Sequence, residues 1–123
     1  MEGVYSHETA LSLFELGEVM PSKLHMTVPT RFRRTGTIPP VLSLHYNCLV
    51  EIDFEKRQGF YVTTPVRTIA DIIESGTMTS RQLASVVSSA NKRGLITKAN
   101  IQQAGISQAL QAKISLMMGG TNE

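Results

Sequence analysis

The fold is decided in residues 59–71, which read GFYVTTPVRTIAD. Up to Thr63 the residues follow the period of two that is typical of a strand, and from Thr64 onward the period becomes 3.6, which is typical of a helix. Thr64 suits the N-cap of that helix, and Pro65 suits its first position, where a proline costs no hydrogen bond. The buried stripe of this helix is predicted at Val66, Ile69, Ala70 and Ile73.

A run of short helices is predicted to follow. Gly76 ends the first helix, because glycine readily adopts the left-handed conformation that closes a helix. Thr79 and Gln82 have the spacing of a capping box, which opens a second helix that Gly94 terminates. Thr97 is predicted to cap a further short helix. A last apolar stripe is expected at Leu110, Ile114 and Met117.

The first half of the chain contains one more helix and several strands. Ser6 is predicted to cap a helix over residues 7–16, and Gly17 to end it. Alternation of apolar and polar residues predicts strands at 24–28, which Pro29 stops, and at 41–46, 51–55 and 60–63, with a turn at 56–59. The expected fold class is α+β: an N-terminal helix and a small, mainly antiparallel sheet, packed with a C-terminal run of short helices.

The composition indicates one ordinary globular domain. The chain has 123 residues, a hydrophobic fraction of 41% and a net charge of +2, so one core is expected and the charge alone does not indicate nucleic-acid binding. We expect the domain to cover residues 1–118 and residues 119–123 to form a flexible tail. The sequence has no long apolar run, no secretory signal and one cysteine, Cys48, so we expect a cytoplasmic protein without membrane contact.

The sequence contains no recognisable catalytic or metal-binding motif. It has no Cys pair, no His-x-x-His spacing and no phosphate-binding glycine loop, so we expect no enzyme, no metal and no cofactor. His25 and His45 lie on the polar faces of two predicted strands and could approach each other, as metal ligands or as hydrogen-bonding groups. Cys48 has no neighbour that would activate a thiol.

One predicted strand has a pattern of charged residues that also occurs in catalytic sites. Glu51, Asp53 and Glu55 alternate along it and Lys56 follows. Metal-dependent nucleases place acids and a lysine around a phosphodiester, but a solvated strand face has the same pattern. The remnant of a nuclease-associated domain is therefore one alternative.

Positive charge is concentrated in one predicted loop. Arg31, Arg33 and Arg34 flank Phe32 between two predicted strands. Such a loop suits an acidic surface on a protein partner, the phosphates of a nucleic acid, or solvent. We expect this loop to be the binding surface of the domain.

Arg67 and Asp71 are four residues apart on the predicted helix, with the arginine first, which is the less favourable order for a helical ion pair. Arg67 also opposes the helix dipole near the helix start. We therefore expect its guanidinium to tie the helix to carbonyl groups of a strand.

Several of these segments together resemble the C-terminal domain of AbiEi-type antitoxins from type IV toxin–antitoxin systems. The similar segments follow the order of the family: GVYSHETAL (3–11), KLHMTVP (23–29), the basic loop 31–34, the pair Leu44-His45, GFYVTTPVRTIAD (59–71) and RGLI (93–96). The resemblance marks nine residues as motif positions: Ser6, His7, His25, Pro29, His45, Thr64, Pro65, Arg67 and Asp71.

The resemblance implies a function. In AbiEi-type antitoxins an N-terminal winged helix binds operator DNA and represses transcription, and the C-terminal part counteracts a nucleotidyltransferase-like toxin without a stable complex. The present chain begins where that second domain begins, so we expect the winged helix to be absent and the antitoxin function to remain. The expectation is an antitoxin-type domain in bacterial abortive infection and phage defence. A nucleic-acid-binding fragment of a transcriptional regulator, which would use the basic loop, is the main alternative.

Overall fold

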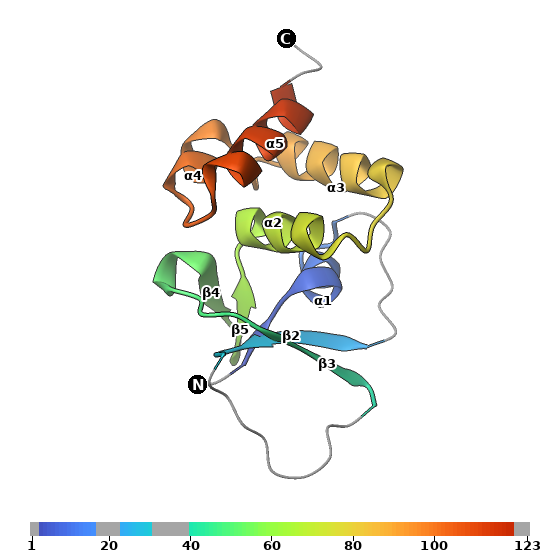
Figure 1. Cartoon of the computed structure of the whole chain (residues 1–123), viewed down its shortest axis with the longest axis vertical. Helices are drawn as coiled ribbons and strands as arrows, with labels where there is room; N and C mark the ends of the chain where they lie inside the picture. Colours follow the sequence, from blue (N-terminus) through green and yellow to red (C-terminus); the bar gives the residue numbers. More distant parts are fainter. Residues whose placement is uncertain (1–2, 17–22, 31–39, 120–123) are drawn as a thin grey trace.

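Residues 3–16, 23–30 and 40–119 are described by the computed structural model of the chain, and they form the expected α+β fold (Figure 1). The strands are β1 (Val4–Tyr5), β2 (Leu24–Val28), β3 (Leu42–Tyr46), β4 (Phe54–Arg57) and β5 (Phe60–Thr63). The helices are α1 (His7–Leu13), α2 (Pro65–Ser75), α3 (Ser80–Lys92), α4 (Lys98–Gln103) and α5 (Gln108–Gly119), and a short 3-10 helix, η1, covers Glu51–Asp53.

The strands named above form one mixed sheet in the order β3-β2-β1-β5-β4. β1 with β2 and β4 with β5 are antiparallel, whereas β2 with β3 and β1 with β5 are parallel. The sequence favoured a mainly antiparallel sheet, and the parallel pairs correct that expectation. One parallel pair, β1 with β5, exists because the short strand β1 lies in the middle of the sheet. β1 was not predicted, since two residues are too few to show a period.

β2 and β3 are paired along their whole length. His25 lies opposite Ser43, and Thr27 lies opposite His45. Because side chains alternate between the faces of a strand and paired residues share a face, His25, Thr27 and His45 lie on the same side of the sheet. The bounds of β2 agree with the prediction, and β3 begins one residue later than predicted.

The predicted strand over residues 51–55 is wrong for Glu51–Asp53, which form η1, and right for Phe54 and Glu55, which begin β4. The N–H of Asp53 donates to the carbonyl of Val50 at 2.8 Å, and the Asp53 carboxylate accepts the Val50 N–H at 2.9 Å. Local hydrogen bonds of this kind from aspartate compete with a strand ladder, so the chain forms η1 here. The hairpin that follows is confirmed, but its turn is shorter than predicted: Lys56 and Arg57 pair with β5, and only Gln58-Gly59 joins the strands, with Gly59 at a φ of 84°.

α1 ends at Leu13, three residues before the predicted end. Glu15 adopts a left-handed φ of 57°, and the N–H of Leu16 donates to the carbonyl of Leu11 at 2.9 Å. This is a Schellman stop in which glutamate takes the place usually held by glycine. Gly17, the predicted terminator, lies outside the described residues.

The other helix ends follow the predicted caps. The Thr64 side chain accepts the N–H of Arg67 at 3.2 Å at the start of α2. Thr79 and Gln82 exchange the two hydrogen bonds of a capping box at the start of α3. The remaining confirmed positions are Thr97 before α4, and Gly76 and Gly94 after α2 and α3, both glycines with left-handed φ angles.

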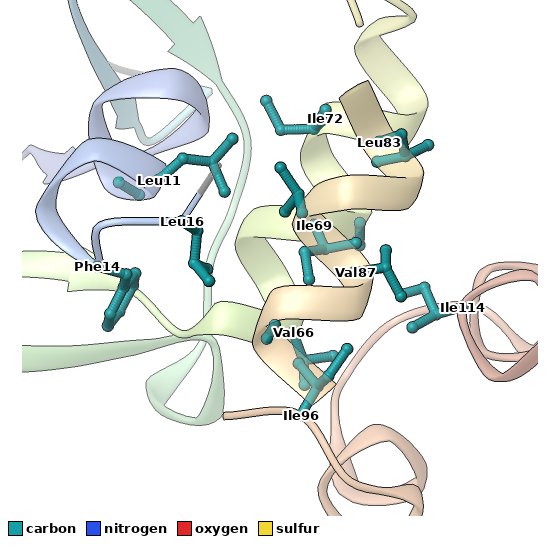
Figure 2. Close-up of a cluster of buried hydrophobic side chains, with 14 of the residues drawn as sticks. Leu11, Phe14, Leu16, Val66, Ile69, Ile72, Leu83, Val87, Ile96 and Ile114 are labelled. Carbon is teal, nitrogen blue, oxygen red and sulfur yellow. The ribbon is translucent and has the colours of Figure 1, made fainter. Parts of the chain in front are cut away.

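The hydrophobic core is centred on α2. This helix lies between α1 with the sheet on one side and the group α3, α4 and α5 on the other (Figure 1). Ile69 and Ile72 of α2 are almost completely buried. Side chains from α1, α3, α5 and the connecting segments surround them (Figure 2), among them Leu11, Leu16, Val87, Ile96 and Ile114. The predicted stripe of α2 is therefore confirmed, although Ile73 is only partly buried.

Candidate functional site

Three histidine side chains lie together where the start of α1 meets β2 and β3, and we call His7, His25 and His45 the histidine cluster. The rings of His7 and His45 are stacked, with 3.7 Å between their centroids and 14° between their planes. Nδ1 of His25 lies 3.0 Å from Nε2 of His45, so one of these nitrogens donates to the other. The predicted approach of His25 and His45 is confirmed, and His7 is a third member that the sequence did not reveal.

Ser6 connects the cluster to the sheet. Its Oγ accepts a hydrogen bond from Thr27 Oγ1 at 2.8 Å and lies 2.8 Å from Nδ1 of His7. Because Ser6 is fully buried and Nδ1 is the acceptor beside its hydroxyl among the described residues, the hydroxyl proton is assigned to Nδ1, which leaves the ring proton of a neutral His7 on Nε2. Ser6 is the N-cap residue of α1, but its side chain makes no capping hydrogen bond. The predicted capping role of this hydroxyl is therefore wrong.

The backbone of His7 is strained. Its φ is 53°, in the left-handed region, where an L-residue loses roughly 1–2 kcal/mol. Strained residues outside glycine concentrate at functional sites, where the surrounding structure holds them in place. With this backbone conformation, the His7 ring lies over His45.

A buried ion pair from α2 lies beside the cluster. Nε and Nη2 of Arg67 lie 3.0 Å and 2.8 Å from the same oxygen, Oδ1 of Asp71. Glu74 Oε1 is 3.9 Å from Arg67 Nη2, and Glu8 Oε1 is 3.8 Å from Nε2 of His25. In the described part of the chain Arg67 donates to no strand carbonyl, so the expected tie to a strand is wrong. The guanidinium instead serves the buried carboxylate of Asp71, which needs a partner.

Burial sets the charge state of the site. Burial, with the neighbouring His45, His25 and Arg67, lowers the pKa of His7 to about 3. Burial and His25 also lower the pKa of His45. Burial raises the pKa of Asp71 to about 6, although Arg67 opposes this change. At neutral pH the two stacked imidazoles are therefore uncharged, and the site is not a cationic receptor for an anion.

A pocket of about 260 Å³ opens beside the cluster, and we call it the histidine pocket. α2 contributes two carboxylates to its wall, and the end of β3 contributes an aromatic ring and an amide. The residues that line it are His7, Thr27, His45, Tyr46, Asn47, Asp71, Glu74 and Ser75. The pocket is thus polar, with uncharged imidazoles on one side and carboxylates on the other.

The geometry of the cluster is unlike that of a metal centre. Within residues 3–16, 23–30 and 40–119, no three His, Cys, Asp or Glu side chains are placed to hold a metal ion. The stacked rings of His7 and His45 and the hydrogen bond between His25 and His45 keep the nitrogens from converging on one point.

The structure brings together six of the nine motif residues. Three others lie elsewhere: Pro29 follows β2 and lines a separate pocket of about 350 Å³, and Thr64 and Pro65 start α2 beside a pocket of about 390 Å³. The expected binding loop, Arg31, Phe32, Arg33 and Arg34, lies outside the described residues. The six residues that converge are Ser6, His7, His25, His45, Arg67 and Asp71.

The acidic residues of the nuclease alternative do not line one strand. Asp53 is buried in η1, where it accepts the Val50 N–H. Glu55 lies on β4 and pairs with Arg57 at 3.1 Å, and both of these side chains are exposed. Cys48 is also exposed. The alternating carboxylates that suggested a nuclease therefore depended on the incorrect strand.

Sequence reasoning missed five residues that line the pocket, namely Thr27, Tyr46, Asn47, Glu74 and Ser75. Glu74 carried a signal, because it follows Asp71 by three positions and so shares its helix face. Thr27 and Asn47 carried none, since their place at the site depends on the pairing of β2 with β3.

A scan against protein-family models finds no match, and a search of curated proteins finds no sequence of significant similarity. Among the described residues, no helix has the length and hydrophobicity needed to span a membrane.

Proposed function

We propose that this chain is an antitoxin-type domain that antagonises a nucleotidyltransferase-like toxin in bacterial abortive infection. One observation supports the proposal most. Four segments that carry the resemblance to AbiEi-type antitoxins, residues 3–11, 23–29, 44–45 and 59–71, are far apart in sequence, and each contributes to the polar group around the histidine cluster. Motif residues that meet in space are typical of a shared recognition site.

The energetics of the group support a functional role. Buried polar side chains and a strained backbone lower the stability of a fold, so an apolar core would be the more stable choice at this place. Here Ser6, His7, Arg67 and Asp71 are all buried, and His7 also has a positive φ. Their presence is explained if they hold a surface in the shape that a partner requires.

We propose recognition rather than catalysis. Ser6 is the hydroxyl beside an imidazole, which is the arrangement of an activated nucleophile, but Ser6 is 0% exposed and its oxygen is already engaged by Thr27. The basic loop Arg31–Arg34 is proposed as a second contact with the toxin. It follows β2, the strand that supplies His25 and Thr27 to the site.

Growth rescue tests the proposal. The chain is co-expressed in bacterial cells with a nucleotidyltransferase-like toxin of the kind that AbiEi-type antitoxins counteract, and colony formation is counted. The wild type should restore growth. His45→Gln, which removes the central imidazole, and the triple change of Arg31, Arg33 and Arg34 to Ala should each reduce rescue.

Lys92→Ala, a change of an exposed lysine at the end of α3, is the control and should rescue fully. Failure of the wild type at matched expression would remove the antitoxin proposal. Full rescue by the triple variant would remove only the role of the basic loop.

A further inference from the structure

We infer that the histidine pocket binds a small neutral sugar through two adjacent hydroxyl groups, and that ribose has a suitable size. This goes beyond the proposed function and does not depend on it. The inference starts from two polar atoms in the wall of the pocket that have no partner in the protein.

The two unpartnered atoms belong to side chains that are more than nine-tenths buried, His7 at 7% exposure and Asp71 at 6%. Arg67 occupies only Oδ1 of Asp71, and Ser6 occupies only Nδ1 of His7. Among the described residues every fully buried side-chain nitrogen or oxygen has a hydrogen-bond partner. Oδ2 of Asp71 and Nε2 of His7 must therefore reach solvent, and the pocket is the space that both residues line.

These atoms have opposite hydrogen-bonding character. Asp71 Oδ2 is an acceptor, whereas the proton placed on Nε2 by the contact with Ser6 makes His7 a donor. Asn47 adds another donor, because its Oδ1 already accepts the N–H of Cys48 and its Nδ2 is left for a ligand. A ligand that satisfies this wall must both donate and accept within a small distance. A pair of neighbouring hydroxyl groups does so.

The charge of the site excludes an anionic ligand. Arg67 carries +1 and Asp71 and Glu74 carry −1 each, so the three sum to −1 beside uncharged imidazoles. A phosphate or carboxylate would be repelled by this arrangement. A cation would meet the carboxylates but would leave the donors of His7 and Asn47 unpaired. A neutral polyhydroxyl compound can donate to the carboxylate of Asp71 and accept from the donors of His7 and Asn47.

The size and the wall of the pocket agree with a single sugar ring. Its volume of about 260 Å³ is below the range of roughly 300–1,000 Å³ that is typical of sites for larger ligands. Tyr46 lies in the wall and is 52% exposed, so its ring offers an apolar surface for the C–H groups of a sugar.

Titration of the whole chain with defined sugars tests the inference. The probes are methyl β-D-ribofuranoside and its 2-deoxy analogue, and binding is followed by two-dimensional NMR of the backbone amides and histidine rings. The riboside should shift signals of His7, Asn47 and Asp71. The 2-deoxy compound should bind about tenfold more weakly, because a missing hydroxyl leaves a buried group unpaired.

Two variants and one control complete the test. Asp71→Asn and the exposed change Asn47→Ala should each weaken riboside binding by about tenfold or more, with the amide spectrum outside the pocket unchanged. Glu51→Gln, at an exposed carboxylate outside the pocket, should bind like the wild type. Adenosine binding much tighter than the riboside would identify the source of the diol as a nucleoside, and equal binding a free sugar.

Equal affinity for the riboside and its 2-deoxy analogue would overturn the inference. So would preferential binding of inorganic phosphate or of N-acetyl-arginine amide at the same residues. The growth-rescue result is independent of these outcomes, because a chain that rescues growth without binding the riboside retains the proposed function and loses only the sugar site.

Discussion

Burial of the His7 imidazole makes the free energy of unfolding depend on pH, because the folded chain binds a proton there less readily than the unfolded chain does. The pKa of the folded state is about 3 and the ordinary value is 6.5, so between these pH values the unfolded chain binds a proton that the folded chain does not. The free energy of unfolding therefore falls as the pH drops from about 6.5 towards 3. Asp71 acts in the opposite direction. Its pKa of about 6 lies above the ordinary 3.8, so stability rises as the pH falls through 6 and the folded chain takes up the proton.

His7→Asn separates these two effects. Asparagine tolerates a left-handed backbone and carries no titrating group, so only the acid-induced loss caused by the imidazole disappears. Between pH 7 and pH 4, the variant should lose about 3 kcal/mol less of its free energy of unfolding than the wild type. Urea unfolding at both pH values measures this. Parallel losses in the two proteins would show that His7 is not a buried neutral base.

Removal of Arg67 should lower the free energy of unfolding, because the buried carboxylate of Asp71 loses its partner. Arg67→Met removes the cation that opposes the rise in the pKa of Asp71, so at pH 7 the buried carboxyl must either stay charged without a partner or take up a proton, with an expected loss of about 3 kcal/mol in the free energy of unfolding. The loss should shrink at pH 5, because Asp71 then takes up a proton and no longer needs a cation. Urea titrations at the two pH values provide the comparison. The same loss at both would mean that Asp71 is not the group that Arg67 stabilises.

At the scale of single elements, the end of α1 contains a position, Glu15, where a substitution is expected to increase the stability of the fold. Glu15 has a φ of 57°, which glycine adopts freely. Glu15→Gly should raise the free energy of unfolding by about 1 kcal/mol, since the folded state loses its strain. Thermal denaturation measures the change, with Glu15→Ala as the control that keeps the strain and should show no gain. A lower melting temperature for the glycine variant would contradict the left-handed stop.

The end of α1 is also tied to α3. The Arg93 guanidinium donates to the carbonyls of Phe14 and Glu15 at 2.8 Å and 3.1 Å, which supplies two of the partners that a helix end lacks. Arg93→Ala should lower the free energy of unfolding by about 1–2 kcal/mol. Lys92→Ala removes the neighbouring cation and should change stability by less than about 0.5 kcal/mol. Equal effects in chemical denaturation would show that charge near the end of α3, and not this contact, is responsible.

Elements whose signals are local could be predicted from the sequence, and elements fixed by distant contacts could not. The caps Thr64 and Thr79 use residues three positions away, so the capping of α2 and α3 was visible in the chain. β1 depends on pairing with β2 and β5, and its two residues show no pattern alone. η1 was mistaken for a strand because the side-chain bond from Asp53 to Val50 outweighs the alternating pattern.

The candidate site followed the same rule. The approach of His25 and His45 was predictable, since both lie on polar faces of neighbouring strands. The position of His7 beside them was not predictable, because it depends on an unusual φ at the first residue of α1. The partner of Arg67 was also misjudged. The sequence order made a helical pair with Asp71 look unfavourable, but burial of both groups makes that pair necessary.

At the scale of the whole molecule, the candidate site is formed by residues from several elements that pack together in the fold. β2 and β3 supply His25 and His45, the start of α1 supplies His7, and α2 supplies Arg67 and Asp71 while its other face forms the core (Figures 1 and 2). The residues of the site come from α1, α2, β2 and β3, so the geometry of the site depends on how these four elements pack together.

The central claim is that these distant segments hold the stacked imidazoles of His7 and His45 together in uncharged form, and an NMR pH titration of the histidine ring protons in the intact chain tests it most directly. The account predicts that the His7 ring stays neutral down to about pH 4 and that its signals move when His45→Gln removes the ring stacked on it. A His7 ring that titrates near its ordinary pKa of 6.5 in the folded protein, and that is unaffected by His45→Gln, would contradict the account.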